Sequence, residues 1–245
     1  MNMTLTNMFE LTACQKDLLT YEPLDGTSCA VTGLNVTSPA AQPVRLVIPG
    51  QAPDGRTVTA IADRAFTRCG SLRTVSLPDS VTYIGVRAFA FCSSLLEIRL
   101  GRNSRLQKIG DRAFMCCERL SVLRLGHLTE LRVCGQSAFA YCTHLRSVVL
   151  PDSLTGLPDG MFEGCRLLEH VRLPGGLRRL GAAAFSACGS LRTVTLPESL
   201  EVIDDSAFAC CGDLQSVHLP DGTCFIASSA FYDCPFPADR LLGVG

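Results

Sequence analysis

Residues 65–78 read AFTRCGSLRTVSLP, and the chain repeats this phrase with few changes from there to its C-terminal end. Eight copies are each centred on a phenylalanine, and successive phenylalanines are 23, 25, 25, 23, 23, 23 and 23 residues apart. A fixed period of this length indicates a solenoid, in which each repeat buries its apolar side against the next one. The eight residues are Phe66, Phe89, Phe114, Phe139, Phe162, Phe185, Phe208 and Phe231.

Each repeat contains a segment with the alternation of a β-strand. In the first copy Val75 and Leu77 are apolar and the residues beside them are polar, which is typical of a strand with one buried face. Pro78 has no N–H group to donate to a ladder, so we expect it to end the strand. The stacked copies therefore predict a parallel β-sheet along the concave face. Wider loops are expected near residues 103–105 and 128–130, where two intervals are longer.

Two further segments complete the repeat. Asp63 stands before Phe66 and is expected to cap the free amides of a short helical turn. Phe66 and Cys69 are three residues apart, so they share the face of this turn that points into the core. Val81 and Ile84 then return the chain along the opposite wall. The predicted fold is a solenoid of α/β type, with a strand, a return segment and a short helical turn in every repeat.

Length and composition favour one elongated unit. The chain has 245 residues, of which 47% are hydrophobic, and a formal net charge of -1. This balance gives no reason to expect nucleic acid or an anionic membrane surface as the main partner. The sequence contains no run of about 18 apolar residues, so we expect no membrane-spanning segment. The predicted organisation is an N-terminal lead-in and cap over residues 1–60, repeats over residues 61–234, and a C-terminal cap and tail over residues 235–245.

The first residues favour a cytoplasmic location as the default. Residues 1–10 lack the basic n-region and the long apolar h-region of a secretory signal. Residues 1–19 are predicted to form either a short amphipathic helix or a disordered leader.

Fourteen cysteines would suggest a disulfide framework in a secreted protein. Eight of them stand three residues after a repeat phenylalanine, so we interpret them as small, buried apolar residues with reduced thiols. Adjacent copies about 5 Å apart would also lie within disulfide reach, and a bridged ladder remains the alternative. The eight residues are Cys69, Cys92, Cys117, Cys142, Cys165, Cys188, Cys211 and Cys234.

The phrase Ala-Phe-x-x-Cys-x-x-Leu-x-x-Val-x-Leu-Pro, with Val-x-x-Ile-Gly after it, resembles the BspA-type leucine-rich repeat, also described as Treponema pallidum-type. The likeness covers residues 61–234, and the stretch before them resembles the strand-rich lead-in of such proteins. The resemblance implies a leucine-rich repeat solenoid in a bacterial or protist protein whose repeats bind other proteins, often as adhesins. It therefore implies a cell-surface or secreted protein as the alternative to a cytoplasmic one.

The sequence shows no pattern of catalytic or metal-binding residues. It lacks a Gly-x-Gly-x-x-Gly motif, a phosphate-binding loop, a Gly-x-Ser-x-Gly elbow and any Cys-x-x-Cys pair. His170 and His218 are placed on outward positions two repeats apart, which is about 10 Å and too far for them to share a metal ion. We therefore expect no enzymatic activity, no cofactor and no metal.

The outward positions of the predicted strands are rich in arginine. Six arginines lie on or beside this face, against only two acids, Glu97 and Glu169. Arg99 and Arg124 are neighbours across the ladder, although like charges in adjacent strands are destabilising. The candidate partner-binding residues are Arg73, Arg99, Arg124, Arg146, His170, Arg172, Arg192 and His218.

This pattern has two interpretations. Arginines that bind carboxylates in a bidentate manner would suit an acidic protein partner. Arginine also supplies 20 of the 22 basic residues, so the pattern would also arise from a solvated charged face. We predict a non-enzymatic protein–protein interaction module that binds its partner on the concave face. A surface-displayed adhesin that binds host or matrix proteins and a self-assembling structural protein are the alternatives.

Overall fold

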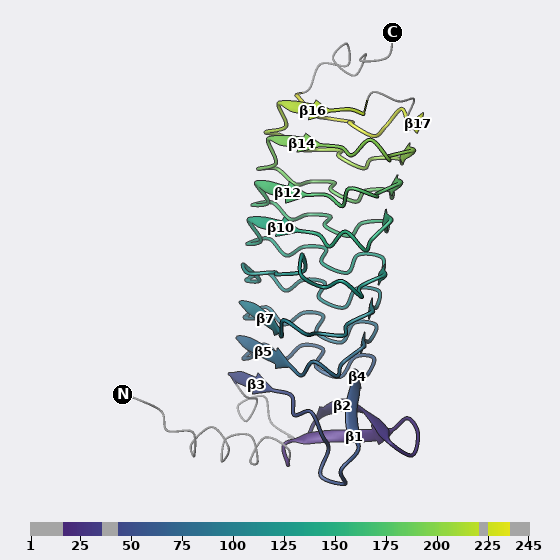
Figure 1. Cartoon of the computed structure of the whole chain (residues 1–245). Coiled ribbons are helices and arrows are strands. Elements are labelled where there is room, and N and C mark those ends of the chain that lie inside the picture. Colours follow the sequence, from purple (N-terminus) through teal and green to yellow (C-terminus); the bar gives the residue numbers. More distant parts are fainter. Residues whose placement is uncertain (1–16, 36–43, 221–224, 236–245) are drawn as a thin grey trace, which may run out of the picture.

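The computed structural model describes residues 17–35, 44–220 and 225–235. Its coils are piled one on another into a column (Figure 1). The described residues contain seventeen β-strands and no helix. The leader expected over residues 1–19 and the tail expected after residue 235 lie almost wholly outside the described ranges.

The strand wall consists of the segments that the alternation predicts. Neighbouring strands run parallel and in register, so Leu46, Val75 and Ile98 face the core one above another. The wall contains three sheets, β3-β5-β7, β10-β12 and β14-β16, and single bridges at Val122 and Arg124 connect the first two. Its strands are β3 (Arg45–Val47), β5 (Thr74–Leu77), β7 (Glu97–Leu100), β10 (Ser147–Val149), β12 (His170–Arg172), β14 (Thr193–Thr195) and β16 (Ser216–His218).

The return wall lies on the opposite side of the column (Figure 1). It contains a six-stranded sheet in the order β1-β2-β4-β6-β8-β9 and a four-stranded sheet in the order β11-β13-β15-β17. All neighbours are parallel except β1 and β2. Its strands are β1 (Leu19–Pro23), β2 (Ser28–Leu34), β4 (Thr57–Ile61), β6 (Tyr83–Ile84), β8 (Lys108–Ile109), β9 (Val133–Cys134), β11 (Gly156–Leu157), β13 (Arg179–Leu180), β15 (Val202–Ile203) and β17 (Phe225–Ile226).

The two longer repeats have wider loops where the spacing predicts them. In the first, the amide of Ser104 donates to the carbonyl oxygen of Gly101 at 3.2 Å; in the second, Leu131 donates to Leu128 at 3.3 Å. The strand wall is reduced to the two single bridges between these loops, at Val122 and Arg124.

The turn wall, which carries the repeat phenylalanines, corrects the predicted short helical turn. In the first repeat the amides of Arg64, Phe66 and Arg68 donate to carbonyl oxygens of the next coil, whereas Thr67 and Cys69 donate within their own coil. This alternation places Arg64 and Arg68 in the left-handed region, with φ of 59° and 63°. A helix would use all of these amides inside one coil. The turns instead connect neighbouring coils through a third hydrogen-bond ladder.

The aspartates that we expected to cap their own turns act between coils instead. Oδ1 of Asp63 accepts a hydrogen bond at 2.8 Å from the amide of Val86 in the next repeat. Asp111 accepts one from Gln136 at 3.0 Å, and Asp159 repeats the contact with the coil that follows it. These carboxylates therefore hold successive coils in register.

The phenylalanine rings form a continuous stack through the core. Neighbouring ring centroids are 5.1–5.7 Å apart with interplanar angles of at most 14°. From Phe66 to Phe208 the side chains are fully buried, and Phe231 packs partly buried at the end. Stacked aromatic pairs add about 0.5–1.5 kcal/mol to the energy of burial.

The cysteines of the repeats are free thiols that donate hydrogen bonds along the stack. Sγ of Cys92 donates to the carbonyl oxygen of Phe66 in the preceding coil at 3.1 Å, and Cys165 donates to that of Phe139 at 3.3 Å. Twelve cysteines lie in the described ranges, and all of them are free. Burial raises the pKa of Cys165 to about 12. The thiols therefore pack in the core and also connect coils.

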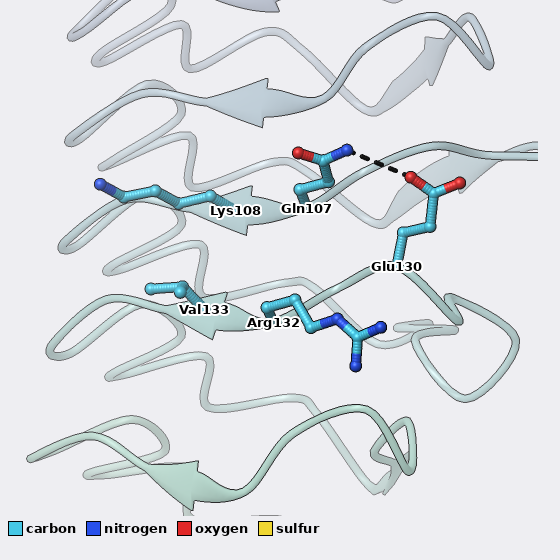
Figure 2. Close-up of a pocket in the computed structure, with 5 residues that line it drawn as sticks. All are labelled: Gln107, Lys108, Glu130, Arg132 and Val133. Atoms are coloured by element: carbon cyan, nitrogen blue, oxygen red, sulfur yellow. Dashed lines mark hydrogen bonds between the residues drawn. The ribbon is translucent and has the colours of Figure 1, made fainter.

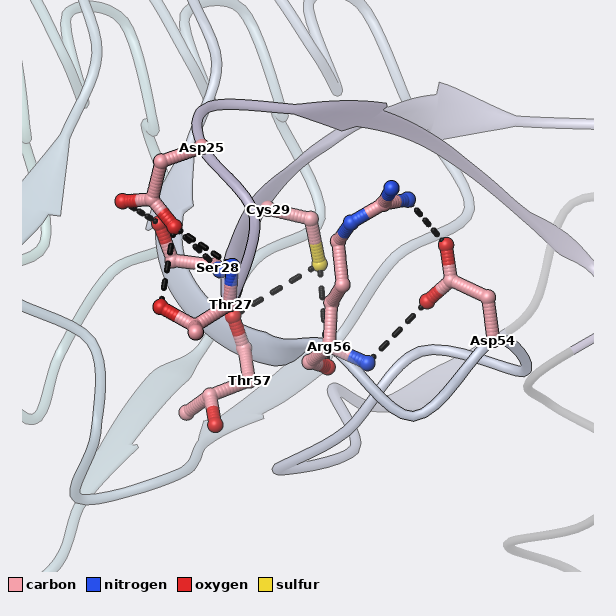
Figure 3. A network of polar contacts seen from close by, with 7 residues as sticks. All are labelled: Asp25, Thr27, Ser28, Cys29, Asp54, Arg56 and Thr57. Carbon is pink, nitrogen blue, oxygen red and sulfur yellow. Dashed lines mark hydrogen bonds and ion pairs between the residues drawn. The ribbon is translucent and has the colours of Figure 1, made fainter.

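A β-hairpin closes the N-terminal end of the column. Its two strands, β1 and β2, lie at the foot of the stack in Figure 1, and β2 pairs with β4 in parallel orientation. Figure 3 shows how Asp25 orders the turn: Oδ1 accepts from the amides of Thr27 and Ser28, both at 2.7 Å. Hydrogen bonds from Ser28 and Thr27 hold the pKa of Asp25 well below its usual range. Figure 3 also shows the ion pair between Arg56 and Asp54 beside this turn.

Replacing Gly135 by alanine is expected to lower the free energy of unfolding by about 1–3 kcal/mol, which is the usual cost of overpacking a core. A Cβ atom there would lie 2.3 Å from the backbone nitrogen of Asp111 and 2.4 Å from its Oδ1, so adjacent coils would have to separate. Urea unfolding monitored by circular dichroism measures the effect. Gly212→Ala is the matched control because nothing lies within 4 Å of its added Cβ. Equal midpoints for the two variants would contradict the prediction.

Candidate functional site

One outward row runs along the strand wall. Register places Ser76 beside Arg99 and Arg124 beside Val149, which in turn lies beside Arg172. Because parallel strands are about 4.8 Å apart, this row presents a side chain at each step of the stack. The row continues to Thr195 and His218 in the last two strands, and it consists of Ser76, Arg99, Arg124, Val149, Arg172, Thr195 and His218.

The structure leaves all eight predicted residues exposed, but it does not gather them at one point. Arg99, Arg124, Arg172 and His218 belong to the outward row. His170 lies in the second outward row, on the other side of the partly buried Val171. The other three, Arg73, Arg146 and Arg192, lie at the rim, one residue before the strands.

Ion pairs neutralise part of this surface. Nε of Arg99 lies 2.7 Å from Glu97, and Nη1 of Arg146 lies 2.5 Å from Glu169. Nη2 of Arg172 lies 3.5 Å from Asp152, a pairing that the strand pattern missed because Asp152 belongs to the loop after β10. Within the described ranges no ion pair involves Arg73, Arg124 or Arg192.

A hollow of about 310 Å³ opens beside Arg172 on the strand wall. It is lined by Val171, Arg172, Leu173, Thr195 and Pro197. It forms where β12 and β14 belong to separate sheets, so the ladder is interrupted at this step of the stack. Nothing in the repeat phrase indicates this interruption, and sequence reasoning therefore missed the hollow.

A second hollow, of about 490 Å³, lies on the return wall. Figure 2 shows its five lining residues, with the side chain of Gln107 directed at Glu130. The amide nitrogen of Gln107 donates to Glu130 at 3.1 Å, and Nζ of Lys108 lies over the ring of Tyr83. The lining therefore contains two cationic side chains, Lys108 and Arg132, and the carboxylate of Glu130, which already accepts a hydrogen bond.

The histidines and acids do not form a metal centre in the part of the chain that the structure describes. Within those ranges, no three His, Cys, Asp or Glu side chains come together as ligands. His144 and His127 instead contact backbone carbonyl oxygens, of Glu118 at 2.8 Å and of Gly101 at 3.0 Å. No helix in the described ranges is long and apolar enough to cross a bilayer.

The coils repeat every 23–25 residues, share a parallel strand wall and enclose a continuous apolar core. These features define a leucine-rich repeat solenoid. The family model of the BspA type leucine rich repeat region matches residues 59–166 and 127–236, with six copies, and the chain belongs to this family. The resemblance seen in the sequence is thereby confirmed. Repeats of this type generally serve protein–protein interaction and are typically non-enzymatic.

Two solved structures have the same architecture. The leucine rich repeat protein of Treponema pallidum is 28% identical, with a TM-score of 0.64, and the match covers 91% of this chain and 90% of that one. A leucine rich cell surface protein of Faecalibacterium prausnitzii is 26% identical, with a TM-score of 0.64, and the match covers 89% of this chain and 73% of that one. No curated protein gives a significant match.

Proposed function

We propose that this chain is a non-enzymatic binding module that binds an acidic segment of a partner protein along its strand wall. The observation that carries the proposal is the exposed row in which Arg99 and Arg124 precede Val149 and Arg172 follows it. Three guanidinium groups around an apolar side chain suit a partner that presents carboxylates on either side of a small apolar residue.

Charge and shape support this assignment. Guanidinium groups bind carboxylates through two parallel hydrogen bonds, which gives orientation as well as energy. Val149 is 44% exposed in the middle of the row and offers apolar contact. The hollow beside Arg172 and Thr195 can receive a side chain that projects from the bound segment.

The ion pairs within the row are exposed to solvent. Arg99 and Arg172 keep 49% and 60% of their side-chain surface exposed in these pairs. Exposed pairs contribute only about 0–1 kcal/mol, so a partner carboxylate can replace Glu97 or Asp152 at low cost. Arg124 has no ion pair in the described ranges and is the first anchor.

The triple variant Arg99→Ser, Arg124→Ser, Arg172→Ser is expected to lose binding to fluorescein-labelled poly-L-glutamate, with a dissociation constant at least tenfold higher than that of the unmodified chain. About tenfold corresponds to 1.4 kcal/mol, which is a modest share of three charge-assisted contacts. Fluorescence anisotropy at low ionic strength measures the change.

The matched control is the triple variant Arg102→Ser, Arg105→Ser, Arg119→Ser, which removes the same charge from exposed positions outside the strand wall. It is expected to bind as the unmodified chain does. Equal losses in both triple variants would reduce the effect to net charge and would overturn the proposal.

We also propose that the protein acts at the cell surface. The support is the similarity to the Faecalibacterium prausnitzii protein, which is described as a cell surface protein, over 89% of this chain. An adhesin would fit this location. Protease treatment of intact native cells, followed by immunoblotting, tests it: protection of the chain until the cells are lysed would favour the cytoplasmic alternative.

A further inference from the structure

Charge is distributed unevenly along the column. Residues 61–135 contain twelve basic and six acidic side chains, whereas residues 150–235 contain five basic and eleven acidic ones. These two segments therefore carry net charges of +6 and -6, although the whole chain is almost neutral. Because coil follows coil, this sequence asymmetry becomes a spatial separation of charge from one end of the stack to the other.

The separation is clean on the turn wall, which we define as the residues from three before to two after each repeat phenylalanine. The first three repeats contribute four basic residues and two acids, Asp63 and Asp111, to this wall. Both acids accept hydrogen bonds from the backbone of the next coil, as Asp159 also does in the fifth repeat. From the fourth repeat onward it carries no basic residue. The basic residues are Arg64, Arg68, Arg87 and Arg112, and the acidic residues of the last four repeats are Asp159, Glu163, Asp205 and Asp233.

The cationic end of the turn wall has few partners inside the chain. Across the described ranges, no ion pair or hydrogen bond involves the guanidinium groups of Arg64, Arg87 or Arg112. Arg68 lies over the ring of Phe91, 5.7 Å from its centroid. These groups retain their capacity for carboxylates from outside.

Exposed rings on the turn wall include Phe91, within the cationic end, and Tyr141, between the two charged ends. Phe91 is 42% exposed and Tyr141 is 38% exposed. A Cβ atom at Gly164 would lie 2.6 Å from the Tyr141 ring, so this glycine allows the ring to lie against the next coil. The next residue in this row is Ala187. Small residues beyond the rings leave space for another surface to approach.

We propose that the turn wall binds the turn wall of a second copy of this chain, in antiparallel orientation. A two-fold axis between the fourth and fifth repeats brings the first repeat of each copy to the eighth of the other, so that Arg64 and Arg68 face Asp233. It also brings the second repeat to the seventh, so that Arg87 faces Asp205. The same contacts occur twice, as a symmetric dimer interface requires.

The size of the wall sets the strength of this contact. Eight coils at about 4.8 Å give a length of about 40 Å, and a width of roughly 15 Å gives about 600 Å² per copy. A total near 1,200 Å² lies at the lower end of specific interfaces. With its charges near the surface, the dimer is expected to be weak, with a dissociation constant in the micromolar range, and to dissociate as salt is added.

The test is a charge exchange followed by sedimentation velocity and light scattering under reducing conditions. Arg64→Glu with Arg87→Glu makes one variant, and Asp205→Arg with Asp233→Arg makes the other. Each alone is expected to weaken self-association at least tenfold, because like charges then face each other. An equimolar mixture is expected to restore it, since every opposed pair is again of opposite sign. The mass should plateau at two chains.

The matched control is Arg102→Glu with Arg105→Glu, which changes the net charge equally in the loop between β7 and β8 and should associate as the unmodified chain does. The unmodified chain tests the proposal without any substitution. A monomer at 100 µM protein and low salt would overturn it, as would association insensitive to salt. Growth beyond two chains would point to end-to-end stacking instead and would also overturn it. A mixture of the two variants that stays monomeric is the fourth contrary result.

Discussion

Above pH 9 the free energy of unfolding is expected to fall steeply, and the protein is expected to unfold cooperatively by about pH 10–11. Burial raises the pKa of Cys134 and Cys165 to about 12, from an ordinary value of 9.0. Burial likewise raises the pKa of Cys117, Cys142 and Cys188 well above that value. At pH 10 the unfolded chain has therefore lost protons that the folded chain still holds.

The direction follows from linkage. A thiol whose pKa is higher in the folded state contributes its full stabilisation below the unfolded pKa, and this contribution is lost as pH rises toward the folded value. Each such thiol lowers the free energy of unfolding by about 1.4 kcal/mol per pH unit in this window. Five thiols together would lower it by about 7 kcal/mol per unit, which is comparable to the whole stability of a typical domain.

Urea unfolding at pH values from 7 to 11, with return to pH 7 to establish reversibility, measures this dependence. Cys165→Ala should reduce the slope above pH 9 by about 1.4 kcal/mol per unit, because it removes one thiol from the sum. Cys210→Ala is the control, since that cysteine is exposed. Stability that is flat from pH 8 to 10.5 would contradict the prediction.

Replacing Phe139 by alanine is expected to cost about 3–5 kcal/mol, the range for removing a large aromatic side chain from a core. Its ring stacks on both sides, 5.3 Å from Phe114 and 5.7 Å from Phe162, and it is fully buried. Each repeat of a solenoid depends on its neighbours, so a defect in the middle also weakens the coupling between the two halves. The urea transition should therefore broaden as well as shift.

The comparison variant is Phe231→Ala in the last repeat. That ring is only partly buried, and its stacking contact within the described ranges is with Phe208 at 5.3 Å. We expect about half the cost and no broadening, because the ring is only partly buried and belongs to the last of the eight repeats. Equal losses at Phe139 and Phe231 would show that the rings act independently and not as a stack.

Much of the fold is readable from the repeat phrase because solenoid contacts are periodic. Val75 and Leu77 predict a strand with one buried face, and the structure has β5 there. The helical turn around Phe66 was wrong for a physical reason. Alternate amides of this segment donate to the next coil, and that pattern depends on the stacked neighbour and not on local propensity.

The candidate site was predictable to a similar extent. Alternation along the strands identified Arg99, Arg124 and Arg172 as outward, and all three are exposed. The pairing of Arg172 with Asp152 depends on where the loop after β10 places the carboxylate, and the hollow beside Thr195 depends on an interrupted ladder. Neither feature can be predicted from the repeat phrase.

The sequence by itself determined the period, the identity of the buried positions and the family, because these follow from which residues recur at which spacing. Tertiary structure alone decided how coils are connected: aspartates and thiols that look local in the sequence bond to the neighbouring coil. It also decided where charge accumulates, since only stacking converts residues about 23 positions apart into neighbours. The surfaces proposed for binding are products of that stacking.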